Sequence, residues 1–330
     1  MPEERERRVP GRLIPLIPAA VLALCFGAIP LPVFVERPGP ARDVIPLIDI
    51  EGPATYQPQS HLYFTTVNYF PPTVYGAAWA GLSPDAVVVP QEAIIPPGIS
   101  REQYERQNVS LMDQSQIAAV AASLRHLSDY PSRHGPGLIV YGTVPGSPAD
   151  GRLFPGDLIT AVDGVTLEGI GAFSREVRDT GPGGTLRLRV RPLEGGEPET
   201  IPIRPTRLEG RVAIGIYPVA NFPLEVRFET GDVTGPSAGL MWALGVTDIL
   251  TPGDLAGGQS VAGTGSIDPR GNVGPIGGVA LKILAAEDAG AEVFFLPPEN
   301  LAEARTADAE IRLVAVSTLR QAVGFLRGSG

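Results

Sequence analysis

A run of 23 residues without a charged side chain, Leu13 to Val35, places the strongest constraint on how this chain folds. About 20 apolar residues are enough to cross a bilayer as a helix. A backbone in lipid must satisfy its own hydrogen bonds, and a helix does so. The prolines of the run stand toward its two ends, which leaves residues 19–29 free of proline. We therefore predict a transmembrane signal-anchor over residues 13–35, with a cleaved signal peptide as the alternative.

Charge and composition narrow the partners that we expect. Four arginines precede the run, so the positive-inside rule places residues 1–12 in the cytoplasm and the C-terminal domains outside it, at the cell membrane. The net charge of −10 argues against a nucleic-acid partner, which would require a basic surface. A single cysteine, Cys25, excludes an intrachain disulfide framework and a cysteine-rich zinc site. With only three histidines besides, we expect no metal and no other cofactor.

After the run, short segments with strand or helix patterns follow one another. Residues 36–44 read as a Pro-rich connector, and the segments IPLIDIEG and HLYFTTVNYF have the alternating or clustered apolar residues of strands. Residues 81–113 are rich in proline and predicted to be irregular. From Asp113 onward, apolar residues recur at helical spacing in DQSQIAAVAASLRHL, which predicts a helix.

Residues 134–205 form a separate, strand-rich unit in this interpretation. The turns SPADG and FPGD separate apolar strand patterns, and TLRLRVRPL alternates with a period of two. This order of turns resembles a bacterial PDZ domain. The resemblance implies a groove that adds a peptide to the sheet as an extra strand, often by its C-terminus. We place the peptide-binding residues at Gly137, Leu138, Ile139 and Val140.

Chemistry is concentrated between Leu224 and Leu296. In GPSAGL, Ser237 stands where a helix begins, beside unpaired backbone N–H groups that could stabilise an oxyanion. Helix capping is the alternative role for that serine. The chain has a single lysine, Lys282, among 26 basic residues, and it lies near the start of a second helix among apolar residues. Burial and a helix N-terminus both disfavour the ammonium form, so its pKa should be low enough for it to act as a base.

These segments, GPSAGL and GTGSIDPRGNVGPIGGVALKILAA, resemble the proteolytic domain of Lon-type serine peptidases. The resemblance implies that Ser237 is the nucleophile, that Lys282 is its general base and that Thr264 orients the lysine. The turn around the nucleophile, whose backbone would hold the oxyanion, comprises Gly235, Pro236 and Ala238. Upstream, LYFTTV and DQSQIAAVAASL resemble the family's early strand and long helix, so the PDZ unit would be an insertion. One departure is Thr234, where the family often has an acidic residue; here Asp232 stands two positions earlier.

The whole layout resembles the membrane-anchored, PDZ-containing Lon-type proteases of bacteria. We expect an α+β fold with five parts: residues 1–12, the anchor 13–35, the first part of the Lon-type domain 36–133, the PDZ domain 134–205 and the catalytic part 206–330. The chain has no phosphate-binding G-x-x-x-x-G-K-[ST] motif, because Leu281 precedes its only lysine. Cleavage should therefore be independent of ATP and directed at unfolded or flexible chains.

Two other interpretations remain. A Ser-His-Asp triad could recruit His61, His126 or His134, since the chain order of a triad varies between folds. The protein could also be a membrane-tethered PDZ scaffold that no longer cleaves, although the three residue types of the proteolytic site are all present. A homo-oligomer is expected from the resemblance, since Lon-type domains tend to form rings.

Overall fold

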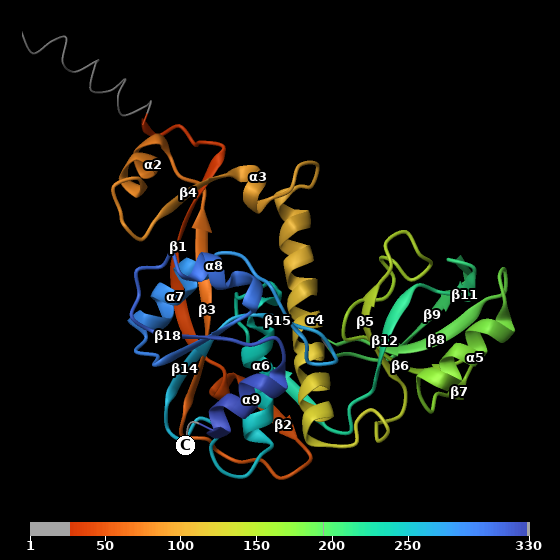
Figure 1. The fold of residues 1–330 in the computed structure, drawn as a ribbon. Helices are drawn as coiled ribbons and strands as arrows, with labels where there is room; N and C mark the ends of the chain where they lie inside the picture. The colour runs from red at the N-terminus through yellow and green to blue at the C-terminus, as the bar shows by residue number, and fades with distance from the viewer. Residues whose placement is uncertain (1–26, 194, 329–330) are drawn as a thin grey trace, which may run out of the picture. The chain divides into compact units, whose positions relative to one another are not determined.

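The computed structural model describes residues 27–193 and 195–328, and it divides into two compact units (Figure 1). The first unit comprises Met1–Pro38 and Val67–Ser100, and the second comprises Gly39–Thr66 and Arg101–Gly330. Strands β1 (Val33–Asp43) and β3 (His61–Phe70) contribute residues to both units. Two of the three points at which the chain passes from one unit to the other therefore lie inside a strand.

The first unit combines one antiparallel strand pair with two short helices. In it β1 pairs with β4 (Val87–Pro90), and the helices are α2 (Val74–Ala80) and α3 (Gln91–Ile94). The α2 helix begins at a capped end, since the N–H of Gly76 donates to Thr73 Oγ1 at 3.3 Å. The predicted connector 36–44 is largely strand, and Pro38 and Pro40 are tolerated because they lie beyond the residues that pair with β4.

The C-terminal limit of the predicted anchor needs correction. Residues 33–35 begin β1, and Phe34 and Val35 are buried there. The prolines at positions 30 and 32 explain the change, because a residue before proline favours extended backbone over helix. Residues 27–32 of the predicted anchor are described too, and Pro30 there forms an isolated β-bridge with Thr73. The remaining residues of the predicted anchor, 13–26, lie outside the described residues. Within 27–193 and 195–328, no helix has the length and apolar character needed to cross a membrane.

Four parallel strands in the second unit form the sheet on which the candidate site is built. Their order is β18 (Arg312–Ala315), β17 (Val293–Leu296), β14 (Ser260–Gly263) and β3. Helix α7 (Val279–Asp288) follows β14 and precedes β17, and η3 (Pro298–Asn300) with α8 (Leu301–Ala304) connects β17 to β18. The chain is thus a mixed α/β protein, in which these parallel strands alternate with helices while other strands pair antiparallel.

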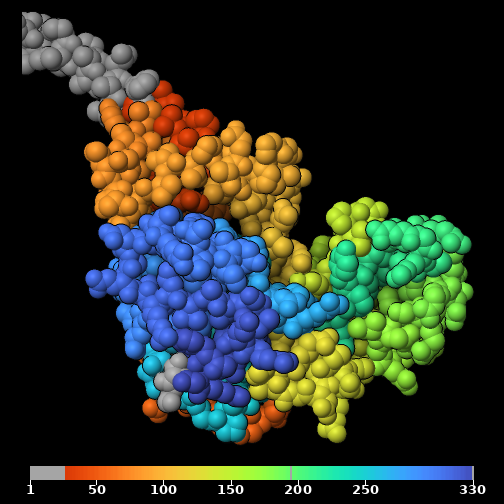
Figure 2. All heavy atoms as spheres, viewed as in Figure 1, coloured from red at the N-terminus to blue at the C-terminus, as the bar shows by residue number. Residues whose placement is uncertain are grey.

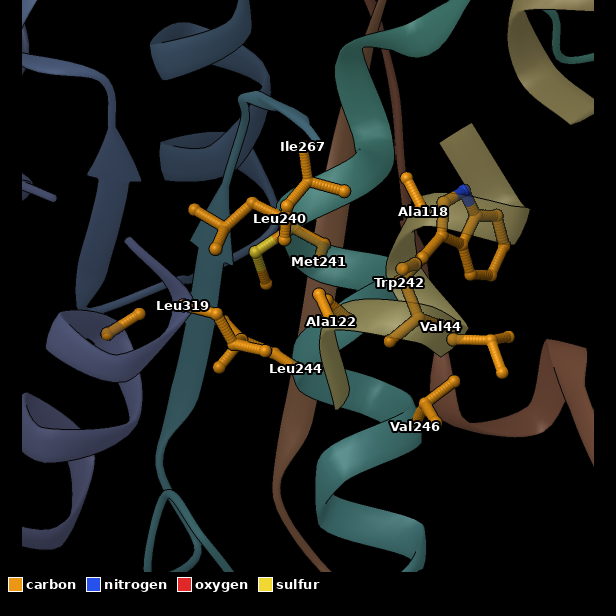
Figure 3. Packing of buried hydrophobic residues seen from close by; sticks show 14 of the residues in the cluster. Val44, Ala118, Ala122, Leu240, Met241, Trp242, Leu244, Val246, Ile267 and Leu319 are labelled. Carbon is orange, nitrogen blue, oxygen red and sulfur yellow. The ribbon is translucent and has the colours of Figure 1, made fainter. Parts of the chain in front are cut away.

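Helices α4 (Arg101–Leu127) and α6 (Gly239–Ile249) pack against each other in the main core. Figure 3 shows Ala118 and Ala122 of α4 beside apolar side chains of α6, among them Trp242. All eleven residues of α6 are buried. Ser123 also joins the two helices, since its Oγ donates to Ala243 O at 2.8 Å. Small side chains on α4 thus allow a close approach that holds α6 in place.

Other elements complete the second unit around this core. The N-terminal segment contributes η1 (Ile45–Leu47) and β2 (Ile48–Glu51), which pairs with β13 (Glu225–Phe228). The remaining elements are the small ladder of β15 (Ser266–Ile267) and β16 (Val273–Gly274), and the C-terminal helix α9 (Leu319–Gly328). Phe228 of β13 lies edge-on against Trp242, with ring centroids 5.2 Å apart. Strand β13 therefore belongs to the same core as α6.

Helix α4 begins 12 residues before the predicted start at Asp113. Its first part, REQYERQNVSLM, lacks an apolar stripe, so hydrophobic periodicity could not reveal it. Arginine, glutamate and glutamine nevertheless favour helix, and Arg101 pairs with Glu105 at 2.9 Å across one turn. The predicted irregular region 81–113 is therefore partly helical.

The inserted part of the second unit is an antiparallel sheet with one helix on its face (Figure 1). Its atoms are mostly green in Figure 2. Its strand order is β12 (Ile216–Ala220), β5 (Leu138–Thr143), β6 (Leu158–Val162), β8 (Leu186–Arg191) and β9 (Glu199–Ile203), with β7 (Val165–Thr166) beside β6. Helix α5 (Ile170–Thr180) and the hairpin of β10 (Thr206–Leu208) and β11 (Arg211–Ala213) complete it. The two faces of β5 differ: Leu138 and Val140 join the unit's own core, and Ile139 joins the core of α4 and α6.

Candidate active site

Ser237 lies in a short 3-10 turn, η2 (Pro236–Ala238), that leads directly into α6. The preceding residue, Gly235, has a φ of 92°, a left-handed conformation that favours glycine. Helix α4 holds the turn, because Gly235 N donates to Asn108 O at 2.9 Å and Ser115 Oγ donates to Pro236 O at 3.2 Å. In the part of the chain that the structure describes, no side chain caps η2 or α6, so the Ser237 hydroxyl is not a helix cap.

Lys282 is the fourth residue of α7, and its side chain is only 4% exposed. The helix begins after Gly278, whose φ and ψ of 68° and 32° are also left-handed. Two fully buried neighbours on the same helix, Val279 and Ile283, make the surroundings of the lysine apolar. The amine of Lys282 is therefore removed from water.

The serine and lysine side chains meet although they are 45 residues apart in the sequence. Lys282 Nζ lies 2.7 Å from Ser237 Oγ and 3.2 Å from Thr264 Oγ1. Thr264 Oγ1 donates to the Ser237 carbonyl at 3.0 Å, and Gly265 N donates to the same oxygen at 2.9 Å. Because the Thr264 hydroxyl donates its hydrogen to that carbonyl, its oxygen lone pairs remain free to accept an N–H of the lysine. The lysine lone pair is then left for the proton of the serine hydroxyl.

Burial controls the protonation of this amine. It lowers the pKa of Lys282 from 10.5 to about 8, and the nearby Glu303 carboxylate acts in the opposite direction with a smaller effect. The position of the amine in the first turn of α7 also disfavours its charged form, because the N-terminus of a helix is the positive end of its dipole. A substantial fraction of Lys282 is thus neutral slightly above neutral pH, as a general base requires.

Two residues that the sequence analysis missed hold the segment before Lys282. The side-chain amide of Asn300 makes two hydrogen bonds with the backbone of Ile276: Ile276 N donates to Oδ1 at 2.9 Å, and Nδ2 donates to Ile276 O at 2.8 Å. Glu303 Oε1 accepts the N–H of Val279 at 3.1 Å, at the first turn of α7. Both follow β17, and polar side chains beyond the carboxyl end of a parallel strand are a signal of a site that the sequence did contain.

The residues predicted for the oxyanion turn are not equivalent. Pro236 has no N–H, and the N–H of Gly235 already bonds to Asn108 O. The N–H groups of Ser237 and Ala238 stand at the start of η2 and α6, where helical geometry supplies no acceptor four residues earlier. Ser237 and Ala238 are therefore the donors that suit an oxyanion, and Gly235 and Pro236 shape the turn.

The other candidate groups from the sequence lie elsewhere. His61 Nδ1 is 2.8 Å from Asp43 Oδ2, His134 Nδ1 is 2.7 Å from Gly135 O, and the pKa of His126 is lowered mainly by partial burial. Asp232 is exposed and pairs with Arg42 at 3.0 Å. The described residues contain no group of three or more His, Cys, Asp or Glu side chains that could hold a metal ion. The arrangement at Ser237 thus offers a serine–lysine pair rather than a histidine triad.

The strand of the inserted sheet that was expected to bind a peptide is paired on both sides. Residues Gly137 to Val140 were assigned to the groove, yet β5 pairs with β12 on one side and β6 on the other, so it has no edge for a further strand. Only an unpaired edge can add a strand, so the assignment of the groove to β5 does not fit this pairing. Among the described strands of this sheet, β12 and β9 are the two edges, and α5 contacts β12.

A cavity of about 630 Å³ lies between the inserted sheet and the rest of the second unit. Gln116 of α4, Leu158 of β6 and Arg191 of β8 contribute to its lining, together with the segment from Asn221 through β13. Strand β13 leads through residues 229–234 to the turn of Ser237. The lining thus ends at Phe228, nine residues before the candidate nucleophile in the sequence.

Comparisons with known proteins agree on the part of the chain that holds this pair. Residues 224–321 match the family model "Lon protease (S16) C-terminal proteolytic domain". The chain is 40% identical over 109 residues to Lon protease 1 of Herpetosiphon aurantiacus, and 34% identical over 109 residues to Lon protease 2 of Bacillus subtilis. These matches cover 32% and 33% of this chain but only 13% and 19% of those relatives. A third relative, Lon protease 1 of Thermus thermophilus, is 44% identical over 77 residues, which are 23% of this chain and 9% of that protein.

Solved structures similar to this chain include two PDZ domains. One belongs to an SdrC-like protein of Listeria innocua, and the other to an SdrC-like protein of Listeria monocytogenes. Both are 28% identical to this chain, with a TM-score of 0.23 and 25% of this chain covered. The matches cover 92% and 87% of those chains.

Proposed function

Residues 224–321 form a Lon-type proteolytic domain, which belongs to a family of serine peptidases, and from this premise we propose that the chain is an ATP-independent serine endopeptidase. The observation that carries the proposal is the distance of 2.7 Å between Ser237 Oγ and the buried amine of Lys282. A lysine whose pKa is lowered to about 8 can accept the proton of a serine hydroxyl that touches it. Thr264 positions that amine through its hydroxyl.

The geometry suggests a two-step peptide hydrolysis. Ser237 Oγ attacks the scissile carbonyl carbon as its proton passes to Lys282 Nζ, and the N–H groups of Ser237 and Ala238 stabilise the oxyanion. The C–N bond then breaks while Lys282 returns the proton to the leaving amine, which leaves an ester on Ser237. A water molecule attacks that ester after giving its proton to Lys282, and the proton finally returns to Ser237 Oγ as the acid product leaves.

Activity should rise with pH as the lysine loses its proton. Because the pKa of Lys282 is lowered to about 8, the reactive neutral form increases from pH 7 to pH 9. The optimum is therefore expected on the alkaline side of neutrality. An acidic optimum without an alkaline rise would contradict the role of the lysine as base.

The decisive experiment measures cleavage of an unfolded protein by the full chain without ATP, beside Ser237→Ala. A serine-directed fluorophosphonate, followed by mass spectrometry, would report which residue is acylated. We expect cleavage and labelling at Ser237 in the parent chain, and neither in Ser237→Ala. Ser317→Ala, which removes an exposed hydroxyl outside the site, is the matched control and should keep both. Absence of cleavage and labelling in the parent chain would favour the alternative, a scaffold that does not cleave.

Substrate delivery is the proposed role of the inserted PDZ-type sheet. An extended peptide would add to the edge of β12 beside α5, with main-chain hydrogen bonds providing most of its affinity. Unfolded or flexible chains suit this mode, because only a segment without its own structure can pair along an edge. Binding of peptides with free and amidated C-termini, measured by fluorescence anisotropy, would test whether a terminal carboxylate is read. Equal failure of both peptides would contradict the proposed delivery.

Membrane tethering is part of the proposal because the run Leu13–Val35 is uncharged and follows arginines. The domains would then lie on the extracytoplasmic side of the cell membrane as a single-pass protein. Homo-oligomerisation remains proposed on the resemblance to Lon-type domains. Flotation of the full chain with lipid vesicles would test tethering, and light scattering in nanodiscs would measure the number of copies. Recovery of all protein in the unbound fraction would contradict the tether.

A further inference from the structure

The first unit carries apolar side chains at the point where the uncharged N-terminal run joins the described fold. Gly27 lies against α2, since a Cβ added there would be only 1.8 Å from a ring atom of Tyr75. Two backbone hydrogen bonds continue this contact: Val74 N donates to Ile29 O at 3.2 Å, and Leu31 N donates to Pro72 O at 3.1 Å. Gly27, which directly follows the uncharged residues 13–26 in the sequence, therefore lies beside α2.

Large apolar side chains are exposed around this junction. On and after α2, Trp79 is 54% exposed and Leu82 is 87% exposed, and Ile29 at the junction is 47% exposed. Val88 of the neighbouring strand β4 is 42% exposed. We name the surface formed by these four residues the α2 face. Soluble proteins rarely gather exposed apolar side chains in this way unless something covers them.

The helix and strand parts of the α2 face are connected through β1. The Arg37 guanidinium lies 4.4 Å from the centre of the Trp79 ring and donates to Ser83 Oγ at 3.3 Å. On β1, Arg37 is two residues after Val35, which is paired with Val88. Because side chains alternate along a strand, Arg37 and Val88 lie on the same side of the sheet, and Val88 is thus on the side that carries Trp79.

Charge is scarce in this part of the chain. The described residues of the first unit, 27–38 and 67–100, contain four charged residues, which are Glu36, Arg37, Asp85 and Glu92. From residue 52 to residue 84 the sequence has no Asp, Glu, Lys or Arg. A tryptophan on a weakly charged apolar surface suits the interface of a bilayer, where one end of its ring system is apolar and the other wet.

We propose that the α2 face docks on a phospholipid bilayer as a second membrane contact of this chain. The inference rests on the membrane tethering proposed above. Ile29 is two residues from Gly27, a reach of about 7 Å in extended chain, so an anchor formed by the preceding run would hold the face at the bilayer surface. Trp79, Leu82 and Ile29 insert among the headgroups, and Val88 lies beside them. A second copy of the chain is the competing occupant.

Tryptophan fluorescence gives a direct test, because the chain has only two tryptophans and the other, Trp242, is fully buried. The full chain is reconstituted in phosphatidylcholine vesicles with or without bromine on the acyl chains. Bromine quenches tryptophan only at contact, so anchoring nearby is not enough. We expect the emission of Trp79 to fall at least twofold in brominated vesicles. Trp79→Phe, which leaves only Trp242, should show no such loss.

A charge placed on the face gives the second test. Leu82→Glu should abolish most of the quenching without releasing the chain from vesicles in flotation. Leu193→Glu, at a residue 52% exposed in the turn after β8, should leave the quenching unchanged. Ser237→Ala should show the same quenching as the parent chain, so failure of docking and failure of proteolysis are separable. Floating protein whose Trp79 is not quenched would overturn the proposal. Protection of Trp79 from iodide without quenching by brominated lipid would also overturn it and assign the face to a second copy.

Discussion

The two sheets of the second unit differ in which atoms they offer for their proposed roles. The parallel sheet of β3, β14, β17 and β18 positions buried side chains, with Thr264 1% exposed and Lys282 4% exposed. The inserted antiparallel sheet offers the backbone of its edge strand β12. A side-chain site depends on single atoms, whereas an edge depends on a row of main-chain groups. Single substitutions should therefore have large effects in the first and small effects in the second.

Removal of the lysine amine should give the largest effect. We expect Lys282→Met to lower kcat/KM for an unfolded substrate by about 10³-fold or more, since loss of the base stops serine activation. The same substitution should not lower the free energy of unfolding at pH 7, because it removes a buried amine that is protonated at that pH. The pKa of Lys282 is about 8 in the folded protein and 10.5 in the unfolded chain, so the unfolded chain binds more protons between these values. The free energy of unfolding of the parent chain therefore rises with pH in that window, by up to about 3 kcal/mol.

Urea unfolding at pH 7 and pH 10 would check this contrast. Lys282→Met should be at least as stable as the parent at pH 7 and should lack the alkaline rise. A variant that is both inactive and destabilised at pH 7 would show that the amine has a structural role as well as a catalytic one.

Loss of the Thr264 hydroxyl should have the next largest effect. Thr264→Val keeps the shape but removes the contacts with Lys282 Nζ and the Ser237 carbonyl. We expect kcat to fall about 10- to 10²-fold with little change in KM, because the hydroxyl positions the base rather than the substrate. Thr264→Ser keeps the hydroxyl and should restore most of the activity. An equal loss in both variants would assign the effect to packing instead.

A change at the edge strand should have a smaller effect that depends on the substrate. Tyr217 on β12 is 56% exposed, and Tyr217→Glu should raise KM for a long unfolded protein by about 5-fold, in line with the modest worth of one contact in a peptide groove. Cleavage of a short peptide should not change. Val165→Glu, at a residue 65% exposed on β7, is the matched control. A loss of kcat on the short peptide would mean that the two sheets are not separate in function.

Removal of the charge of Glu303, which makes no hydrogen bond with Lys282 itself, should give the smallest effect. Glu303 raises the pKa of Lys282, so Glu303→Gln should move the alkaline rise of kcat to lower pH. The amide can still accept the N–H of Val279, which keeps the start of α7 in place. We expect activity at pH 7 to increase by less than about threefold. Glu299→Gln, at an exposed residue of η3, should leave the pH profile unchanged. A shift to higher pH in Glu303→Gln would contradict the sign of this electrostatic effect.

Sequence reasoning found the catalytic candidates because they lie in short continuous motifs. Turn, helix and side-chain signals occur together in GPSAGL and in the segment around Lys282. The presence of a single lysine among 26 basic residues also marked Lys282 as unusual. Sequence reasoning missed Asn300 and Glu303. These residues follow β17, and they contact the start of α7 and the segment before it only because β17 and β14 are neighbours in the sheet. It also assigned the peptide groove to β5, since the pattern of a strand does not tell whether its edges are paired.

The sequence by itself determined the types of local structure, the turns and the residues able to carry nucleophilic chemistry, since these depend on neighbours along the chain. The tertiary structure decided three further matters: that Lys282 is buried against Ser237, that β12 and not β5 is an edge, and that Ile29 and Trp79 are exposed. The pKa of an amine, the pairing of a strand and the exposure of a side chain all depend on groups that are distant in the sequence. Only folding brings those groups within a few ångströms of one another.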